Sequence, residues 1–452
     1  MKADVISKPV SHSTAGKSFN FKQFNRSPIG IFKNAQNPAK QPVWEIHHNR
    51  SIPHYISPSE YTAIIDPQNL FKENEQVLLL FVIFSNPNHF TAREILRQTW
   101  ANTSEFNYSQ FSKMHGHLKE QYLPFNHPEW KRYAHEYDTN EIIDGSDFDA
   151  ANFRIRRVFL IGQTETEEMQ NQVLAESQKY NDIIQEDFVD TYKNLTLKTA
   201  MMMKWVNNNC AEKVKFIMKA DEDTFVNVPN LIHFLLGGTI PVYNATLNRY
   251  VEQYKENIMD VLHSNSRLSY EEDLLIGCRL CSIMPCSVPE DKWFSPPFMY
   301  DREIFPIFLA GGSGYVFTMS TAAKLYKASM EVPLVLAEDA YFTGICAEKA
   351  KIQPKNFHLF NNGYYSDMCD FLGGITQHQT ELNVLKFVYD IIMNSDYRCA
   401  TPPNQIETDI KDSTESCSDK FAFRHPNGNC AGTFYNLPTK NIDLIRSIGS
   451  AF

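Results

Sequence analysis

The sequence lacks several of the signals by which broad protein classes are recognised. No apolar run approaches the roughly 20 residues that a transmembrane helix needs, and no segment has the pattern of a signal peptide. The longest apolar run, Val77 to Phe84, has the length of a buried strand. Lys and Arg number 43 against 53 Asp and Glu, which gives a net charge of −10. This balance argues against binding of nucleic acid or anionic lipid through overall basicity.

Two familiar nucleotide motifs are also missing. The glycine cluster Gly311, Gly312 and Gly314 is not followed by Gly-Lys-Ser/Thr, as a P-loop would be. It does not stand at a first βα turn either, where the dinucleotide fingerprint occurs. The cluster still predicts a backbone that approaches a ligand closely or turns with positive φ before a strand.

The cysteines do not form a complete zinc motif. Of nine, only Cys278, Cys281 and Cys286 lie close together, and no nearby His or Cys supplies a fourth ligand. Disulfides are therefore favoured over zinc, which would fit a secretory route. Asn-X-Ser/Thr triplets point the same way, although such triplets are frequent by chance; among them are those that begin at Asn102, Asn107, Asn194 and Asn244.

What the chain does contain is ample material for a core, with 452 residues, 43% of them apolar and 13% aromatic. Apolar runs alternate with amphipathic stretches, which predicts a largely parallel sheet with flanking helices. The expected strands are Val77–Phe84, Arg157–Ile161 and Val214–Met218. The expected helices are Ala92–Trp100, Glu165–Lys179, Asn194–Asn208 and one that begins at Thr321.

Composition divides the chain into three parts. Residues 1–72 are rich in Ser, Asn, Pro and Lys without a sustained period, so we expect a flexible arm or stem and a fold that begins near Gln76. Residues 73–395 form the expected α/β domain, with surface insertions near 105–154 and 237–276. Residues 396–452 form a weakly patterned extension that contains cysteines.

The acidic triplet Asp221-Glu222-Asp223 directly follows the apolar run VKFIM. In open α/β sheets, ligands bind outside the carboxyl ends of the strands. Two aspartates in a D-x-D pattern at such an end can share a divalent cation, which leaves coordination positions free for phosphate oxygens. Taken alone, so short a pattern is more often a helix cap or a solvated turn.

Three further features could belong to the same site. Arg93 and Arg97 lie four residues apart on an expected helix, where they could bind phosphate or be solvated. Glu338-Asp339 follows an apolar stretch, where desolvation would make a carboxylate a better general base, although acidic residues also favour helix N-termini. His378 is a candidate third metal ligand, but a single His is more often an ordinary surface or core residue.

Taken in order, these segments resemble the β-1,3-glycosyltransferase family, which includes β-1,3-galactosyl- and β-1,3-N-acetylglucosaminyltransferases. Six segments between about Val77 and Met393 are similar to family motifs in the family's order. They are REILRQTW (Arg93 to Trp100), VFLIG (Val158 to Gly162), YNDIIQEDFVDTYKNLTLKT (Tyr180 to Thr199), KADEDTFVNV (Lys219 to Val228), FLAGGSGYVFT (Phe308 to Thr318) and EDAYFTGI (Glu338 to Ile345).

The resemblance implies a GT-A fold, with a Rossmann-like, mostly parallel sheet, and an inverting hexosyltransferase. The implied reaction moves galactose from a UDP-sugar to a glycan hydroxyl in β-1,3 linkage. By the same resemblance, Mn²⁺ is the metal, and Asp339 is the catalytic base. The implied metal ligands are Asp221, Asp223 and His378, and the implied donor contacts are Arg93, Arg97, Asp221, Glu222, Gly311, Gly312 and Glu338.

The family's proteins are anchored in the Golgi membrane and face its lumen, so the resemblance implies that location and an acceptor on a glycoprotein or glycolipid. Because no anchor stands in this sequence, we expect an incomplete N-terminus or a soluble isoform. Transfer of N-acetylglucosamine, and a non-catalytic homologue that binds sugar nucleotides, stay open as alternatives. A metal-dependent phosphohydrolase would need more His and Asp ligands than the sequence offers.

Overall fold

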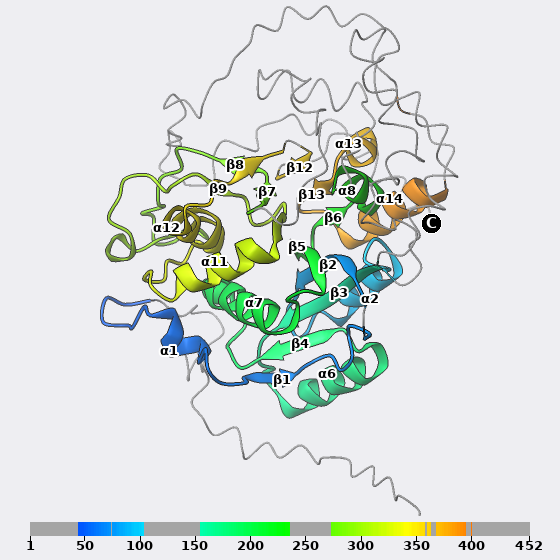
Figure 1. Cartoon of the computed structure of the whole chain (residues 1–452), viewed down its shortest axis with the longest axis horizontal. Helices are drawn as coiled ribbons and strands as arrows, with labels where there is room; N and C mark the ends of the chain where they lie inside the picture. The colour runs from blue at the N-terminus through cyan, green and yellow to red at the C-terminus, as the bar shows by residue number, and fades with distance from the viewer. Residues whose placement is uncertain are drawn as a thin grey trace, which may run out of the picture.

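A computed structural model describes residues 44–73, 75–103, 154–235, 273–357, 359–362, 368–394 and 399 (Figure 1). The two expected insertions fall almost entirely outside them, as do residues 1–43 and, except for Cys399, the expected C-terminal extension.

An eight-stranded sheet runs through the molecule in the order β1-β4-β3-β2-β5-β10-β7-β11. Its centre is parallel: β2 (Val77–Phe84) lies between β3 (Arg154–Ile161) and β5 (Val214–Asp221), and β3 pairs with β4 (Ile183–Glu186). Beyond β5, the strand β10 (Tyr315–Thr318) is antiparallel to both β5 and β7 (Leu275–Gly277). The edges are β1 (Ala63–Ile65) and β11 (Lys355–Asn356). The predicted GT-A type of α/β fold is confirmed.

Helices cover both faces of the sheet because both faces of its central strands are apolar (Figure 1). In β2, Phe81 and Ile83 face a core that includes side chains of α2 (Phe90–Gln98), α8 (Val228–Leu235) and α14 (Leu382–Asn394). Leu80 and Val82 face a second core that includes side chains of α7 (Leu195–Asn209) and α11 (Met319–Ser329). Every residue of β2 is buried, which explains its uninterrupted apolar sequence.

The remaining elements are short, apart from the helix α6. Thr166 caps α6 by accepting a hydrogen bond from the Met169 N–H, and Asn181 ends the helix in the left-handed conformation. The remaining bounds are α1 (Ile52–Ile56), α6 (Glu167–Tyr180), η3 (Tyr192–Asn194), β6 (Phe225–Val226), β8 (Arg279–Leu280), η4 (Pro297–Met299), β9 (Phe308–Leu309), η5 (Ala340–Cys346), α12 (Ala347–Ala350), β12 (Phe360–Asn361), α13 (Met368–Gly373) and β13 (Thr376–Gln377).

The fold begins earlier than Gln76. Trp44 is 2% exposed, and β1 joins the sheet as an antiparallel partner of β4. The Lys204 ammonium reaches across from α7 and donates hydrogen bonds to the Ile56 carbonyl, at 2.7 Å, and to the Thr62 hydroxyl. The expectation of a flexible arm up to residue 72 is therefore wrong for residues 44–72. Their few apolar contacts are too widely spaced to produce a sequence period.

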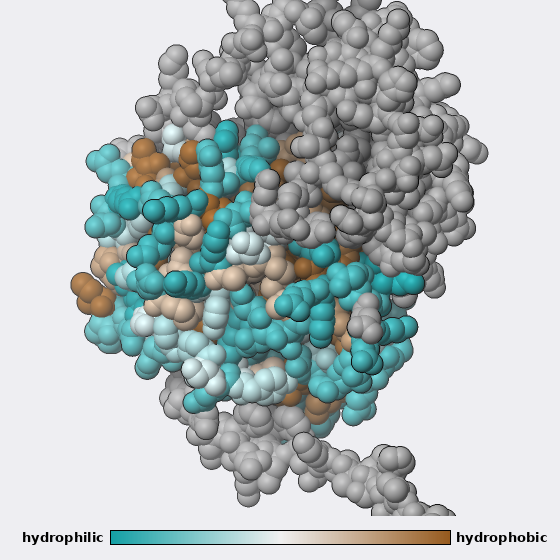
Figure 2. All heavy atoms as spheres, in the orientation of Figure 1, coloured by the Kyte–Doolittle hydropathy of each residue, from teal (hydrophilic) through white to brown (hydrophobic). Residues whose placement is uncertain are grey.

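The preference for disulfides over zinc holds for two of the three clustered cysteines. Cys281 and Cys286 are disulfide-bonded, whereas Cys278 carries a free thiol. A further disulfide joins Cys369 to Cys399. Within the described ranges, no helix is long and apolar enough to cross a membrane. Figure 2 shows one face of the molecule, where the coloured part is mainly hydrophilic.

One of the glycosylation triplets is not accessible. Asn194 is fully buried and donates a hydrogen bond from its side-chain amide to the Val189 carbonyl. The hydroxyl of Thr196, the third residue of that triplet, donates to the Val335 carbonyl at 2.7 Å. This triplet therefore carries no evidence for a secretory route.

Candidate active site

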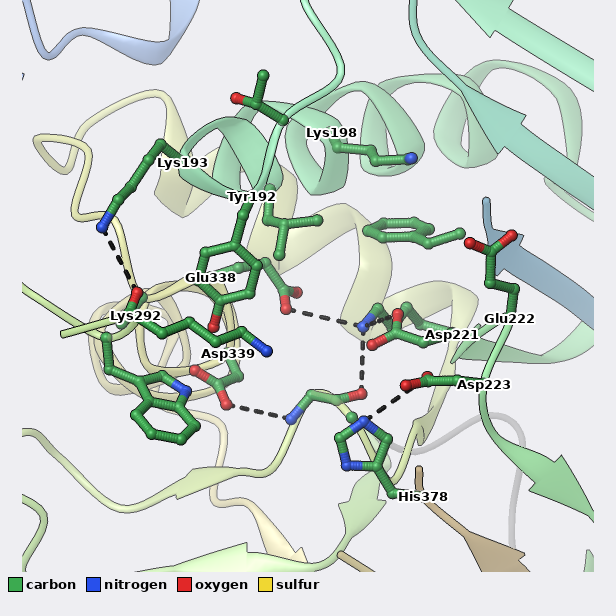
Figure 3. A pocket seen from close by; sticks show the side chains of 18 of the residues that line it. Tyr192, Lys193, Lys198, Asp221, Glu222, Asp223, Lys292, Glu338, Asp339 and His378 are labelled. Atoms are coloured by element: carbon green, nitrogen blue, oxygen red, sulfur yellow. Dashed lines mark hydrogen bonds and ion pairs between the residues drawn. The ribbon is translucent and has the colours of Figure 1, made fainter. Parts of the chain in front are cut away.

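A cavity of about 550 Å³ opens where the parallel strands end (Figure 3). Its walls come from the segments that follow β2, β4 and β5, from the turn between β9 and β10, and from the start of η5. These segments meet because parallel strands bring their carboxyl ends to one edge of the sheet. The cavity is therefore in the place where the sequence predicted a ligand.

The side chains of the acidic triplet have two different environments. Asp221 ends β5, and Asp221 and Asp223 both turn toward the same part of the cavity. Glu222 instead accepts a hydrogen bond from the Ser85 hydroxyl at 2.6 Å and lies against the ring of His89. Glu222 thus lines the cavity while it ties β5 to the segment after β2.

Asp221, Asp223 and His378 are brought together although His378 lies far along the chain from the two aspartates. One ligand atom from each lies within 4.8 Å of the others. The Nε2 atom of His378 is 3.7 Å from Asp223 Oδ1, and its Nδ1 atom is buried without a hydrogen-bond partner among the described residues. Burial lowers the pKa of His378, which favours the neutral imidazole that metals bind. Two carboxylates and an imidazole form a donor set that a divalent metal ion can bind.

Gly312 is required by the ring of His378. A Cβ atom at this position would lie 2.1 Å from His378 Cε1, closer than any real contact. The Thr224 hydroxyl donates to the Gly312 carbonyl at 2.7 Å, and the Thr380 N–H donates to the Asp223 carbonyl at 2.8 Å. These bonds hold the glycine turn, the acidic triplet and the histidine segment in one arrangement.

Lys219, which the sequence did not single out as a site residue, is the central cation of the cavity wall. Its ammonium lies 2.6 Å from Asp221 Oδ1 and 3.9 Å from Glu338 Oε2, and it donates to the Gly311 carbonyl at 3.1 Å. Burial lowers the pKa of Lys219, but Asp221 and Glu338 outweigh this effect and raise the pKa overall. Lys219 therefore stays charged and links the two acidic motifs.

Glu338 is buried and held by hydroxyl groups. Both Thr199 and Tyr315 donate hydrogen bonds to Glu338 Oε1, each at 2.9 Å. Burial raises the pKa of Glu338 to about 7, although Lys219 acts in the opposite direction. Glu338 lines the cavity and orients its neighbours.

Asp339 presents its carboxylate to the cavity beside the glycine turn. Its Oδ2 accepts a hydrogen bond from the Gly311 N–H at 3.1 Å, and its Oδ1 accepts one from the Ala340 N–H at 2.8 Å. Burial raises the pKa of Asp339, while these two N–H groups act to lower it. A carboxylate that is both desolvated and fixed in direction is suited to accept a proton.

Arg93 and Arg97, expected to bind phosphate, do not line the cavity. The Arg93 guanidinium is fully buried and makes a two-pronged ion pair with Glu176, with N to O distances of 2.9 and 2.7 Å. Arg97 makes a similar pair with Asp182. The interpretation of the two arginines as donor contacts is therefore wrong, because acidic side chains of other segments already use their charge.

Arg93 influences the cavity indirectly, through hydrogen bonds to the turn after β2. It donates to the Ser85 hydroxyl at 3.0 Å, to the Asn86 carbonyl at 2.6 Å and to the Pro87 carbonyl at 3.2 Å. Ser85 and Asn86 line the cavity. Arg93 thus holds in place the turn after β2, which forms one wall of the cavity.

Several other residues that line the cavity were not predicted from the sequence. Lys198 on α7 is ion-paired with Asp190 at 2.8 Å and donates to the Ser85 carbonyl at 2.7 Å. Tyr192 belongs to the same sequence block, and Lys292 comes from the segment between β8 and β9. Tyr192 and Lys198 both lie in the block Tyr180 to Thr199, whose resemblance to a family motif does not indicate which of its side chains line a cavity.

Comparison with known proteins agrees with this geometry. Residues 142–358 match a family model described as galactosyltransferase. β-1,3-Galactosyltransferase 2 of Homo sapiens is 28% identical over 335 residues, which span 73% of this chain and 62% of the relative. The orangutan (Pongo abelii) protein of that name is 28% identical, over 76% of this chain and 66% of the relative. Both alignments therefore span less than two thirds of the relative's length.

A third relative is covered more fully. β-1,3-Galactosyltransferase 1 of Mus musculus is 27% identical over 378 residues, which span 82% of this chain and 83% of the relative. The family model, the relatives and the GT-A type of sheet all point to one assignment. The chain is therefore similar to the galactosyltransferase family and, within it, to β-1,3-galactosyltransferases.

Proposed function

We propose that the protein is an inverting galactosyltransferase that moves galactose from UDP-galactose to a hydroxyl of a glycan acceptor in β-1,3 linkage. The observation that carries this proposal is that Asp221, Asp223 and His378 lie within reach of one ion in the same cavity as the hydrogen-bonded carboxylate of Asp339. The names of the relatives supply the sugar and the linkage.

In this proposal Asp221, Asp223 and His378 hold Mn²⁺. The ion would supply Lewis-acid stabilisation of the charge that develops on the departing UDP. The chain's own part is orientation: Lys219 fixes Asp221 by an ion pair of 2.6 Å, and Gly312 leaves space for the His378 ring. The diphosphate of the donor thereby takes a defined position near the end of β5.

Asp339 accepts the proton of the acceptor hydroxyl as that oxygen attacks the anomeric carbon. The new bond forms on the face opposite the departing UDP oxygen, so one displacement converts an α-linked donor into a β-linked product. The N–H groups of Gly311 and Ala340 hold the carboxylate in place but leave lone pairs available for the acceptor proton. Proton transfer by such a group contributes roughly 10²- to 10⁴-fold to rate.

The substitution Asp339→Asn tests this assignment. It keeps the size of the side chain but removes the base, so transfer should fall by roughly 10²-fold or more. UDP should still bind in the presence of Mn²⁺, as measured by calorimetry. Asp301→Asn, at an exposed position that does not line the cavity, is the matched control. Undiminished transfer by Asp339→Asn would remove Asp339 from the role of base.

A donor screen separates this proposal from its two alternatives. UDP release with Mn²⁺ and a panel of acceptors should be faster from UDP-galactose than from UDP-N-acetylglucosamine. The opposite order would assign the enzyme to N-acetylglucosaminyl transfer. Binding of UDP without release from any sugar nucleotide would instead favour a non-catalytic homologue.

We also propose that the protein works in the Golgi lumen, in association with the Golgi membrane. The disulfide Cys369–Cys399 and the disulfide-bonded Cys281 and Cys286 support an oxidising compartment. Microscopy of the protein in its native cells, with a Golgi marker, tests this location. A diffuse cytosolic signal would contradict it.

A further inference from the structure

The wall of the cavity beside Asp339 is aromatic and partly exposed. Tyr192 and Trp293 are two of the few large hydrophobic side chains with substantial exposure, at 37% and 41%. Both line the cavity, although they come from segments that are a hundred residues apart. Such side chains are normally buried in a soluble protein, so their exposure at a cavity indicates a ligand surface.

An ammonium group lies between the two rings. The Nζ atom of Lys292 is 4.7 Å from the centre of the Tyr192 ring and 5.8 Å from that of the Trp293 ring. Cation–π attraction holds the amine in this position without consuming its hydrogen-bond donors. Within the described part of the chain, no carboxylate forms an ion pair with Lys292. Its N–H donors are therefore available to a ligand.

Hydrogen bonds anchor both supporting segments. The backbone N–H of Trp293 donates to Asp291 Oδ1 at 2.9 Å, and the Ser295 N–H donates to the carbonyl of the disulfide-bonded Cys286 at 2.8 Å. The buried amide of Asn194 fixes the turn that carries Tyr192. Lys193 joins the two segments through a hydrogen bond of 3.4 Å to the Lys292 carbonyl. A preformed surface of this kind costs little free energy to organise when it binds.

The position of this surface relative to Asp339 identifies its ligand. Figure 3 shows the Tyr192 hydroxyl and the Lys292 amine on the side of the cavity where Asp339 lies, away from Glu222. An inverting displacement needs the acceptor next to the base and the UDP next to the metal triad. The surface therefore adjoins the place where the acceptor must present its hydroxyl.

We propose that Tyr192, Lys292 and Trp293 form the binding subsite for the acceptor sugar. The ligand is a pyranose whose apolar C–H face packs on the Trp293 and Tyr192 rings while its hydroxyl groups accept hydrogen bonds from Lys292. This proposal rests on the proposed transferase function for its chemistry. The binding surface itself can be tested without turnover.

The kinetic test measures UDP release from UDP-galactose with Mn²⁺ and a series of methyl β-glycosides as acceptors. Trp293→Ala should raise the acceptor KM about three- to tenfold, in line with the strength of one aromatic contact, and change the KM for UDP-galactose less than twofold. Trp293→Phe should recover most of the affinity, and Lys292→Met should also raise the acceptor KM. Tyr61→Ala, at an aromatic residue that is 74% exposed and lies outside the cavity, is the control.

The binding test uses saturation-transfer NMR of methyl β-galactoside and methyl β-N-acetylglucosaminide with the protein, UDP and Mn²⁺. Signals on the sugar C–H protons that disappear in Trp293→Ala, with an unchanged melting temperature, would support the subsite even in a protein without turnover. An unchanged acceptor KM in Trp293→Ala would overturn the proposal. So would a rise confined to the KM for UDP-galactose, which would place the uracil on these rings.

Discussion

Replacing Arg93 distinguishes a structural clamp from a phosphate contact. The change Arg93→Met keeps the apolar stem and removes a guanidinium that is fully buried. Its two hydrogen bonds to Glu176 and its bond to Ser85 would be lost, as would its bonds to the Asn86 and Pro87 carbonyls. Among the described residues, Glu176 would keep Arg97 as its one cationic partner.

The expected cost follows from burial. Removal of one partner from a buried ion pair costs about 3–5 kcal/mol, because a desolvated charge is left without compensation. In a domain of 150–250 residues each kcal/mol lowers the melting temperature by about 2–4 °C, so we expect a fall of roughly 10 °C. Arg302→Met is the matched control, since Arg302 is 59% exposed and its pair with Glu348 contributes about 0–1 kcal/mol.

Thermal melts and urea titrations of both variants, with UDP affinity measured alongside, decide the matter. The clamp predicts a large loss of stability in Arg93→Met and almost none in Arg302→Met. The reasoning would be refuted by an Arg93→Met protein that unfolds within 1 kcal/mol of the wild type while its affinity for UDP falls tenfold or more. That result would restore Arg93 as a phosphate ligand.

Two further predictions concern the cavity wall. Gly312→Ala should weaken Mn²⁺ binding by about 10- to 100-fold in a metal titration, because the added methyl displaces the His378 ring that we propose as a ligand; unchanged affinity would dissociate His378 from the metal. The pKa of the Glu338 carboxyl is raised from 4.5 to about 7, so its contribution to the free energy of unfolding is complete below pH 4.5. This contribution is lost as the pH rises through 7, and the loss amounts to at most about 3 kcal/mol. In urea titrations, the free energy of unfolding of the wild type should therefore fall relative to that of Glu338→Gln between pH 5 and pH 8. A difference in unfolding free energy that does not change with pH would contradict the raised pKa.

Some of the fold could be read from local pattern alone. The strand Val77–Phe84 has the bounds that its apolar run predicts, because a strand buried on both faces shows no polar residue. The strand expected at Val214–Met218 instead continues to Asp221. The apolar run ends at Met218 because Lys219 is charged, yet Lys219 stays buried in the strand through its ion pairs with Asp221 and with Glu338, which is distant in the sequence.

The errors at the site have the same origin. Spacing on a helix correctly placed Arg93 and Arg97 on one face, but their partners Glu176 and Asp182 are about 80 residues further along the chain. The folded residues between Trp44 and Lys72 were missed because part of their contacts are with distant elements, such as the hydrogen bonds of Lys204 to the Ile56 carbonyl and the Thr62 hydroxyl. By contrast, the acidic triplet and Asp339 stand where strand ends and loops meet, and that rule follows from the class of fold.

The stereochemistry of transfer tests the central proposal most directly. Wild-type protein, Mn²⁺, UDP-galactose and the methyl glycoside acceptors are combined, and the anomeric configuration of the new bond is read by proton NMR. We predict a β-linked galactoside, because Asp339 activates the acceptor for one displacement from an α-linked donor. An α-linked product would contradict this mechanism, and so would transfer that persists undiminished in Asp339→Asn.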